Sequence, residues 1–337
     1  MQFCKRKAGK LITYSEIRKK YKVNPLRDHN AIAACITHFI QSDDASYKNL
    51  LSSKLHEVEI KNVSNIKFDV PFPPIQKPLF KFIDLFAGIG GFRIAMQNLK
   101  GKCVFSSEID KYAKKSYELN FAEVPFGDIT KINEKDIPDH DILCAGFPCQ
   151  SFSIAGKRKG FNETRGTLFF DIARILSEKR PKAFLLENVK GLKNHDKGKT
   201  LRVVLDILRN DLNYNVPEPK ILNAKDYGLP QNRERIFIVG FRKDLNLDKF
   251  IYPETVDYQK TFSDIKEEDE VSVKYYLSET YQKTLIQHKE RHKEKGNGFG
   301  FQIIGDDDQA NAIVVGGMGR ERNIVIDCRL TDFTPIT

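Results

Sequence analysis

Residues 80–93 read FKFIDLFAGIGGFR, an apolar run that passes directly into a glycine-rich turn. Glycine lets the backbone turn sharply and approach a ligand closely, and the helix N-terminus after such a turn is a natural ligand site. We therefore expect a buried strand over 81–86 that ends in a binding loop. A dinucleotide fingerprint would need a small residue at position 93. Arg93 stands there, which argues against a pyrophosphate-binding NAD site.

Outward from this stretch, short apolar runs alternate with amphipathic segments as far as residue 241. The expected strands are 81–86, 102–106, 142–147, 183–186 and 236–241, and the expected helices between them are 167–179 and 199–210. This alternation predicts an α/β fold with a mostly parallel sheet covered by helices on both faces. Ligands of such sheets bind outside the carboxyl ends of the strands.

Acidic residues follow the next two expected strands. Glu108 comes about 20 residues after the first glycine of the turn, where an acid is placed to accept both ribose hydroxyls of an adenosine. Asp128 ends the segment Val124-Pro-Phe-Gly-Asp, where a third strand is expected to end, and suits an adenine amino group. A glycine turn alone is a common structural feature. The turn, Glu108 and Asp128 in this order favour an adenosine cofactor.

A cysteine lies just past the strand expected at 142–147. Cys144 falls within that strand and fits a buried structural cysteine, whereas Cys149 lies in the loop that follows. A thiol in such a loop can be accessible and, near positive charge, partly ionised. The polar, glycine-containing segment after Cys149 is expected to close over a substrate.

Two further polar motifs follow. Glu187-Asn188-Val189 ends the next expected strand, and a carboxylate there can hold a base and donate a proton if burial raises its pKa. Gln231-Asn-Arg233-Glu-Arg235 opens the last strand. Its two arginines at alternate positions of an extended segment share one face, the geometry of a phosphate or carboxylate clamp.

The ordered series Asp84-Leu-Phe-Ala-Gly-Ile-Gly-Gly, Gly146-Phe-Pro-Cys-Gln, Glu187-Asn-Val and Gln231-Asn-Arg-Glu-Arg resembles the bacterial DNA cytosine-5 methyltransferases of type II restriction–modification systems. The likeness is dense over 80–245 and weaker beyond. It implies a Rossmann-like methyltransferase fold that uses S-adenosylmethionine and releases S-adenosylhomocysteine, without a metal. It also implies base flipping of a cytosine in double-stranded DNA, and protection of that DNA from a cognate endonuclease.

The resemblance assigns roles residue by residue. Cys149 would attack carbon 6 of cytosine, Glu187 would protonate or hydrogen-bond N3, and Arg233 and Arg235 would steady the base or a phosphate. The implied cofactor residues are Asp84, Phe86, Ala87, Gly88, Gly90, Gly91, Glu108, Ile109, Asp128, Ile129, Pro148 and Leu168. The implied DNA contacts are Gln150, Ser151, Ser153, Arg158, Arg165 and Gln231.

Four segments are expected along the chain: a basic helical extension over 1–70, a proline-rich linker over 71–79, the catalytic domain over 80–250 and a partial target-recognition domain over 251–337. Helical patterns begin near Tyr14-Ser15-Glu16-Ile17 and run over 31–40. The extension fits either a solvated helical appendage or a small helix-turn-helix module that touches DNA, and the solvated appendage is slightly favoured.

Composition limits the class of protein. The 337 residues carry 55 Lys and Arg against 45 Asp and Glu, a net charge of +10 that favours a polyanionic partner. The six cysteines are scattered without a CxxC pair, which argues against zinc and against a disulfide framework. No signal peptide or apolar membrane span is apparent, so we expect a cytoplasmic protein with no membrane partner, monomeric unless a second chain joins it.

Two family segments that normally follow the recognition domain, an Arg-rich pattern and a Gly-Asn-Ser turn, are not found. We therefore expect either a truncated product or a second polypeptide that supplies the missing C-terminal part. Three alternatives to the autonomous enzyme stay open: a non-catalytic DNA-binding or regulatory remnant, one subunit of a split methyltransferase, and an RNA cytosine methyltransferase. Retention of Cys149, Glu187 and both arginines counts against the remnant.

Overall fold

The computed structural model describes residues 12–20, 32–42, 47, 66–148, 168–247, 249–269, 271–296, 300–313 and 322–327. The chain forms two compact units, Met1–Pro219 with Ile236–Phe250 and Lys220–Arg235 with Ile251–Thr337. The first unit ends at Phe250, and residues 220–235 of the predicted catalytic domain belong to the second unit. The expected linker over 71–79 lies within that unit.

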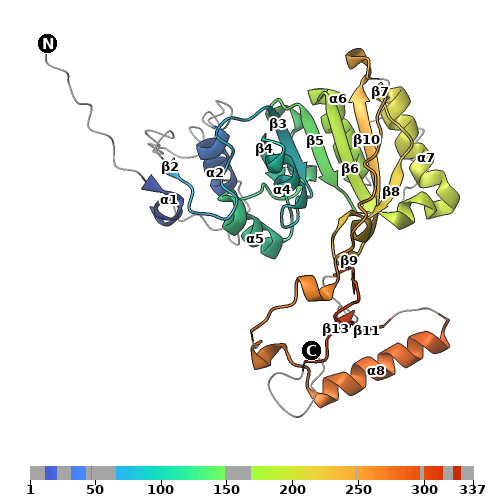
Figure 1. Ribbon diagram of the computed structural model, residues 1–337. Coiled ribbons are helices and arrows are strands. Elements are labelled where there is room, and N and C mark those ends of the chain that lie inside the picture. Colours follow the sequence, from blue (N-terminus) through green and yellow to red (C-terminus); the bar gives the residue numbers. More distant parts are fainter. Residues whose placement is uncertain are drawn as a thin grey trace, which may run out of the picture. The chain divides into compact units, whose positions relative to one another are not determined.

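The first unit holds a central sheet and its helices (Figure 1). Its elements are β1 Ile12–Thr13, α1 Tyr14–Lys20, α2 Ile32–Ser42, β2 Ile66–Lys67, β3 Phe80–Leu85, α4 Gly91–Asn98, β4 Gly101–Ser107, α5 Lys111–Phe121, β5 Ile142–Gly146, α6 Leu168–Lys179, β6 Ala183–Val189, α7 Lys199–Asp206 and β7 Tyr214–Asn215. Strand β10, Glu234–Arg242, begins in the second unit and ends in the first.

The sheet has seven strands in the order β4-β3-β5-β6-β10-β7, with β8 (Lys220–Asn223) also paired to β10. Strand β3 is parallel to both β4 and β5, so Leu85 lies opposite Ser107 on one side and Ala145 on the other. Strands β5 and β6 are also parallel, whereas β7 pairs with β10 antiparallel. The predicted mostly parallel α/β sheet is confirmed. Its strands read as continuous apolar runs because both faces are buried.

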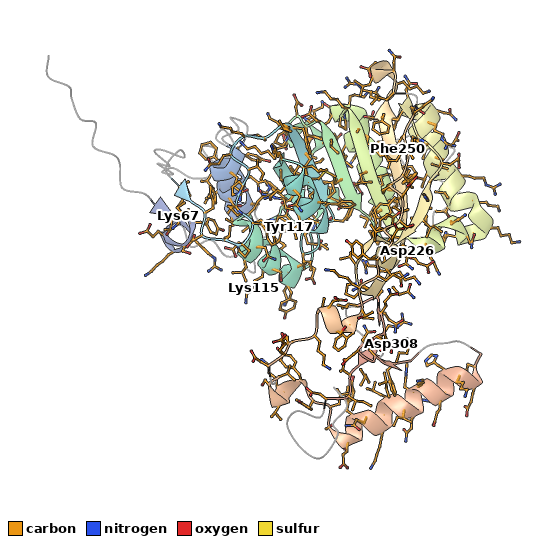
Figure 2. The ribbon with its side chains drawn as sticks, viewed as in Figure 1. Lys67, Lys115, Tyr117, Asp226, Phe250 and Asp308 are labelled. Atoms are coloured by element: carbon orange, nitrogen blue, oxygen red, sulfur yellow. The ribbon has the colours of Figure 1, made fainter. Side chains whose placement is uncertain are left out.

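Helix α5 shows how local sequence sets the packing. The Asp110 side chain caps its first turn by accepting from the backbone N of Tyr112 and Ala113 at 2.9 and 2.7 Å. Lys115 points to the surface, whereas Tyr117, two residues on, is fully buried (Figure 2). This helix was not predicted, because its polar surface residues mask a short apolar face.

The third strand predicted to end at Asp128 does not form. Residues 124–128 run beside β4 but make only one parallel bridge, between Phe126 and Ser107. Pro125 has no backbone N–H, so this segment cannot extend a ladder of hydrogen bonds along the strand. Asp128 nevertheless reaches the same end of the sheet as Glu108.

The described part of the N-terminal segment is packed into the first unit. Helix α1 begins at a reciprocal cap, in which Thr13 N donates to Glu16 Oε2 (2.8 Å) and Glu16 N donates to Thr13 Oγ1 (3.2 Å). Helix α2 lies against β4 and is buried along residues 33–41 (Figure 1). The favoured expectation of a solvated appendage is therefore wrong for α2, because its apolar residues face protein on every side.

The proline-rich segment is also held to the first unit. Phe72 N donates to the Asn120 carbonyl and Leu79 N to the Lys100 carbonyl, both at 2.9 Å. The Pro73 carbonyl accepts from Gln97 Nε2 at 3.0 Å. These bonds fix the path of 72–79 over the ends of α4 and α5.

The second unit is built from short elements. They are β8 Lys220–Asn223, β9 Gln231–Asn232, α8 Glu279–Glu294, β11 Gln302–Ile303, β12 Ala310–Asn311 and β13 Asn323–Ile324. Strand β12 pairs with β9 and β11 with β13, both parallel. Helix α8 buries only Leu285 among its described side chains. Among all the helices that the structure describes, none has the length and apolar character needed to cross a bilayer.

His140 makes stability depend on pH. Burial lowers its pKa from 6.5 to about 4, while its Nδ1 stays 2.9 Å from the Pro138 carbonyl oxygen. Below pH ~6.5 His140 becomes protonated in the unfolded chain but stays neutral in the folded chain. The free energy of unfolding should therefore fall between pH ~6.5 and ~4, by up to about 3 kcal/mol. Urea unfolding across this pH range measures it.

In the variant His140→Gln, the stability should no longer fall in this way as the pH is lowered. His195→Gln, at a half-buried position in the same unit, serves as the matched control and should keep it. If the free energy of unfolding of His140→Gln still falls as much at acid pH, another group is responsible for the fall.

Candidate cofactor and catalytic site

The loop between β3 and α4 has an unusual backbone. Phe86, Gly88 and Gly90 all have positive φ, at 55°, 56° and 99°. The loop is tied to the neighbouring strand because Ala87 N donates to the Ser107 carbonyl at 2.9 Å. A non-glycine residue in the left-handed region, such as Phe86, is held there only by strong surrounding contacts and often marks a functional site.

The glycines of this loop have different surroundings. A Cβ on Gly90 would lie 2.2 Å from Phe121 Cε2, so Gly90 permits the close packing of α4 on α5. A Cβ on Gly88 would meet nothing within 4 Å, and the same is true of Gly127. Gly90 is thus required by packing, while Gly88 and Gly127 border open space.

Glu108 joins the loop to the end of β4. Its Oε2 accepts from Gly88 N at 2.7 Å and its Oε1 accepts from Asp110 N at 2.8 Å. Its own backbone N donates to the Phe126 carbonyl at 2.8 Å. Because each carboxylate oxygen has two lone pairs, both oxygens can also accept from the hydroxyls of a ribose.

The groups next to Glu108 complete a surface that fits an adenosine. Ile109 is 74% exposed, so its apolar side chain is available to an adenine ring. Asp128 is held by Thr130, whose N and Oγ1 donate to its Oδ1 at 3.0 and 2.8 Å. Ile129 is buried beside it. The open space at Gly88 and Gly127, the Glu108 acceptors and the exposed Ile109 suit the nucleoside part of S-adenosylmethionine.

Asp84 lies beneath the loop. Its side chain is fully buried, and Tyr117 OH donates to its Oδ2 at 3.4 Å. Burial raises the pKa of the Asp84 carboxyl well above its ordinary value, and Arg93 offsets only part of this effect. The contact of Asp84 with the cofactor stays a prediction, since its side chain is fully buried in this structure.

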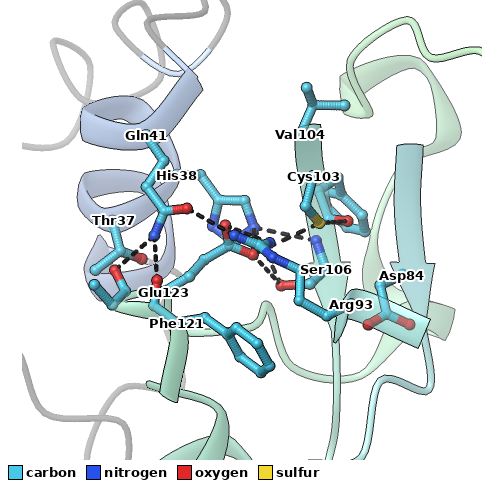
Figure 3. A network of polar contacts seen from close by, with 12 residues as sticks. Thr37, His38, Gln41, Asp84, Arg93, Cys103, Val104, Ser106, Phe121 and Glu123 are labelled. Atoms are coloured by element: carbon cyan, nitrogen blue, oxygen red, sulfur yellow. Dashed lines mark hydrogen bonds and ion pairs between the residues drawn. The ribbon is translucent and has the colours of Figure 1, made fainter. Parts of the chain in front are cut away.

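Arg93 is the centre of a buried polar network (Figure 3). Its Nη1 donates to Glu123 Oε2 at 3.0 Å, its Nη2 donates to Gln41 Oε1 at 2.8 Å, and its Nε donates to Gln97. Burial alone would raise the pKa of Glu123, but the Arg93 guanidinium beside it lowers it to about 2. From the sequence alone, Arg93 served only to argue against an NAD site, because its partners lie 30 and 52 residues away.

The predicted catalytic residue Glu187 lies where β5 and β6 end side by side. Gly146 is the register partner of Glu187, and a Cβ built on Gly146 would lie 3.7 Å from Glu187 Oε2 and 4.0 Å from the Phe86 carbonyl oxygen. The Glu187 carboxylate therefore borders the same glycine as the cofactor loop. Cys144 is buried in β5 as expected, and burial raises the pKa of its thiol.

Asn188 was missed as a site residue. It is buried, its Nδ2 donates to the Phe147 carbonyl at 2.9 Å, and its Oδ1 accepts from Val189 N at 2.8 Å. It thereby fixes the end of β5 immediately before the exposed Pro148. An asparagine directly after Glu187 at a strand end was the available signal.

The predicted nucleophile and most of the predicted DNA contacts are not among the residues that the structure describes. Cys149, Gln150, Ser151, Ser153, Arg158 and Arg165 lie outside the described residues. Leu168 opens α6 and is half-buried. No group of three or more His, Cys, Asp or Glu within the described ranges is arranged to hold a metal ion.

The two predicted arginines belong to the second unit. Arg233 N donates to Asn223 Oδ1 at 2.9 Å, and Arg235 Nη1 donates to the Glu234 carbonyl at 2.8 Å. Both side chains are half-buried. Gln231 lies on β9, opposite Ala310 of β12. Their approach to Glu187 stays a prediction.

The parallel sheet, the β3–α4 loop and the acid after β4 define the Rossmann-like α/β methyltransferase class. Solved structures agree with this fold. The S. pombe Dnmt2 methyltransferase matches 75% of this chain and 78% of its own chain, at a TM-score of 0.53 and 22% identity. The DNMT2 of Spodoptera frugiperda matches 74% and 75% at TM-score 0.54 and 22% identity.

Sequence comparison identifies the family. The profile of the C-5 cytosine-specific DNA methylases matches residues 80–326. Type II methyltransferase M.HpaII of Haemophilus parainfluenzae is 65% identical over 272 residues, which cover 80% of this chain and 76% of that protein. M.DsaV of Dactylococcopsis salina is 51% identical over 68% of this chain and 65% of its own, and M.HhaI of Haemophilus parahaemolyticus is 57% identical over 55% and 56%.

This chain belongs to the C-5 cytosine-specific DNA methylases, and its relatives are methyltransferases of type II restriction–modification systems. The resemblance seen in the motifs is confirmed. Enzymes of this family take their methyl group from S-adenosylmethionine. The matched part spans about three quarters of M.HpaII and less than two thirds of M.DsaV and M.HhaI.

The two loop glycines should respond differently to alanine. Gly90→Ala should destabilise the fold by about 3 kcal/mol or more, because its Cβ would overlap Phe121. Gly88→Ala should cost only about 1 kcal/mol, the cost of a left-handed alanine, yet weaken S-adenosylhomocysteine binding at least about tenfold by filling the open space. Thermal unfolding and calorimetric titration measure the two effects. Full ligand affinity in Gly88→Ala would show that the ligand lies elsewhere.

Proposed function

We propose that this chain transfers the methyl group of S-adenosylmethionine to carbon 5 of a cytosine within a specific duplex DNA sequence. The observation that carries the proposal is the convergence at Gly146, where the Glu187 carboxylate and the Phe86 carbonyl of the cofactor loop both approach one residue. Cys149 follows three residues later in the chain. A cofactor bound at the loop would thus lie beside Glu187 and the segment that carries Cys149.

The cofactor supplies an electrophilic methyl group when bound. Glu108 would accept from its ribose, Asp128 from its adenine amino group, and Ile109 would cover one face of the ring. The other residues proposed to line the site are Phe86, Ala87, Gly88, Gly90, Gly91, Ile129, Pro148 and Leu168. The support is the open space at Gly88 and the acceptor set on Glu108.

Cys149 and Glu187 would make carbon 5 reactive. Carbon 5 of cytosine is a poor nucleophile, and addition of the Cys149 thiolate to carbon 6 converts the ring to an enamine. A proton given or shared by Glu187 at N3 would stabilise that adduct. After methyl transfer, loss of the carbon 5 proton and departure of the thiolate restore the ring. Arg233 and Arg235 would steady the base or a neighbouring phosphate.

The substrate base must leave the duplex to reach these groups, at a cost of a few kcal/mol in stacking and pairing. The segment with Gln150, Ser151, Ser153, Arg158 and Arg165 is proposed to cover the flipped nucleotide, with Gln231 nearby. The net charge of +10 supports contact with phosphates. Methylation would protect the site from a cognate endonuclease. We propose that the protein acts in the cytoplasm, either as a monomer or together with a second polypeptide.

Cys149→Ser should abolish methylation because a hydroxyl cannot replace the thiolate in the addition step. The full chain is incubated with labelled S-adenosylmethionine and mixed-sequence duplex DNA, and 5-methylcytosine is quantified. We expect label with the wild type and a loss of at least about a thousandfold in the variant. Cys144→Ser, on the buried strand cysteine, is the control for loss of a thiol.

The same assay separates the alternatives. Covalent trapping on DNA that contains 5-fluorocytosine, but not on the matching RNA, is the expected result. Trapping on RNA alone would assign an RNA methyltransferase. DNA binding without label or trapping would indicate a regulatory remnant, and label only after addition of the product of the adjoining reading frame would indicate a split enzyme.

A further inference from the structure

Strand β4 lies at one edge of the sheet, and Glu108 follows its last residue. An edge strand presents backbone groups without partners in the sheet, and such groups must be covered. Residues 124–126 cover only the last part of β4: Phe126 N donates to the Ser106 carbonyl at 2.8 Å, and Glu108 N donates to the Phe126 carbonyl at 2.8 Å. The rest of this edge needs another element.

The N-terminal segment supplies it. His38 Nδ1 lies 2.8 Å from the Ala34 carbonyl oxygen and so carries a proton, while Ser106 N donates to His38 Nε2 at 3.1 Å. Tyr47 OH donates to the Val104 carbonyl. His38 and Tyr47 therefore satisfy outward-facing backbone groups of β4 from outside the sheet, in a buried setting where an unmade hydrogen bond is costly.

Helix α2, which carries His38, also reaches the end of the cofactor loop where α4 begins. Gln41 Oε1 accepts from Arg93 Nη2 at 2.8 Å, and Gln41 Nε2 donates to the carbonyls of Phe121 and Ala122 at 2.7 and 2.9 Å (Figure 3). Arg93 lies in the first turn of α4, three residues after Gly90. Helix α2 thus bonds to both elements that hold the loop, namely β4 and α4.

A short chain of contacts leads from α2 to the cofactor groups. Glu123 joins the two branches, because its Oε2 accepts from Arg93 and its Oε1 accepts from Ser106 Oγ at 2.8 Å and lies 3.1 Å from His38 Nε2. Ser106 is two residues before Glu108, and Glu108 holds Gly88 N. Apart from the contact between Glu123 and His38 Nε2, each step is a hydrogen bond or two residues along the chain, and all these groups except Glu108 and Gly88 are buried.

We propose that α2 is a built-in part of the cofactor site, with His38 and Gln41 as positioning residues for S-adenosylmethionine binding. They hold the end of β4 and the start of α4 at the separation that Glu108 and Gly88 require. Neither residue touches the cofactor. This inference rests on the proposed function, and it gives the N-terminal segment a role in cofactor affinity that differs from DNA contact.

The test uses the full chain and measures the calorimetric affinity for S-adenosylhomocysteine, the affinity for a DNA duplex, and the thermal midpoint. We expect His38→Ala and Gln41→Leu each to weaken S-adenosylhomocysteine about tenfold, the scale of coupling through a contact network, with DNA affinity unchanged. His38→Gln, whose side-chain amide can accept from Ser106 N, should recover most of the affinity.

Ile36→Val is the matched control, since Ile36 is a buried apolar residue of the same helix. It should lower the thermal midpoint without changing ligand affinity. Amide hydrogen exchange of the ligand-free chain gives a second readout: His38→Ala should speed exchange at Ser106 and Gly88 more than Ile36→Val does.

The outcomes are distinguishable. A merely structural α2 would show in His38→Ala and Gln41→Leu as fewer binding-competent molecules with an unchanged dissociation constant, and this result overturns the inference. A loss of DNA affinity alone also overturns it. Failure of the wild-type chain to bind S-adenosylhomocysteine would instead overturn the proposed cofactor site.

Discussion

The ion pair between Arg93 and Glu123 is buried on both sides, and the elements of the cofactor site meet on it. The guanidinium lies 5.4 Å from the centre of the Phe121 ring and 5.9 Å from that of Tyr117, so it has exchanged water for aromatic faces and fixed acceptors. Removing one partner of such a pair typically costs 3–5 kcal/mol, because the other charge is left uncompensated. Its geometry is therefore strongly constrained.

That constraint sets the positions of the surrounding elements. Arg93 fixes the start of α4, Glu123 fixes the segment that covers β4, and α2 contacts both. The loop from Phe86 to Gly90 is held between these elements, with its left-handed residues stabilised by their neighbours. A site built in this way can present Glu108 and the open space at Gly88 without rearranging, which lowers the entropy lost on binding a flexible cofactor.

The five longer strands of the central sheet were predictable because each is buried on both faces and is therefore a continuous apolar run, whereas the short strands were not predicted. Glu108 and Glu187 were predictable as strand-end acids. The third strand was wrongly predicted because Pro125 was given too little weight. The Arg93 network and the docking of α2 could not be predicted, since each depends on partners far away in the chain, whereas Asn188 was missed despite its place beside Glu187 at a strand end. For α2, the basic residues earlier in the segment suggested a surface role, whereas the helix itself carries no Lys, Arg, Asp or Glu and is buried along its length.

The central claim is that the first unit contains a preformed site for S-adenosylmethionine at the ends of β3 and β4. Urea unfolding of the full chain, followed by circular dichroism at increasing concentrations of S-adenosylhomocysteine, tests it most directly. The account predicts that the free energy of unfolding rises by about 1.4 kcal/mol for each tenfold increase in ligand above its dissociation constant. A free energy of unfolding that does not change with ligand concentration would contradict it.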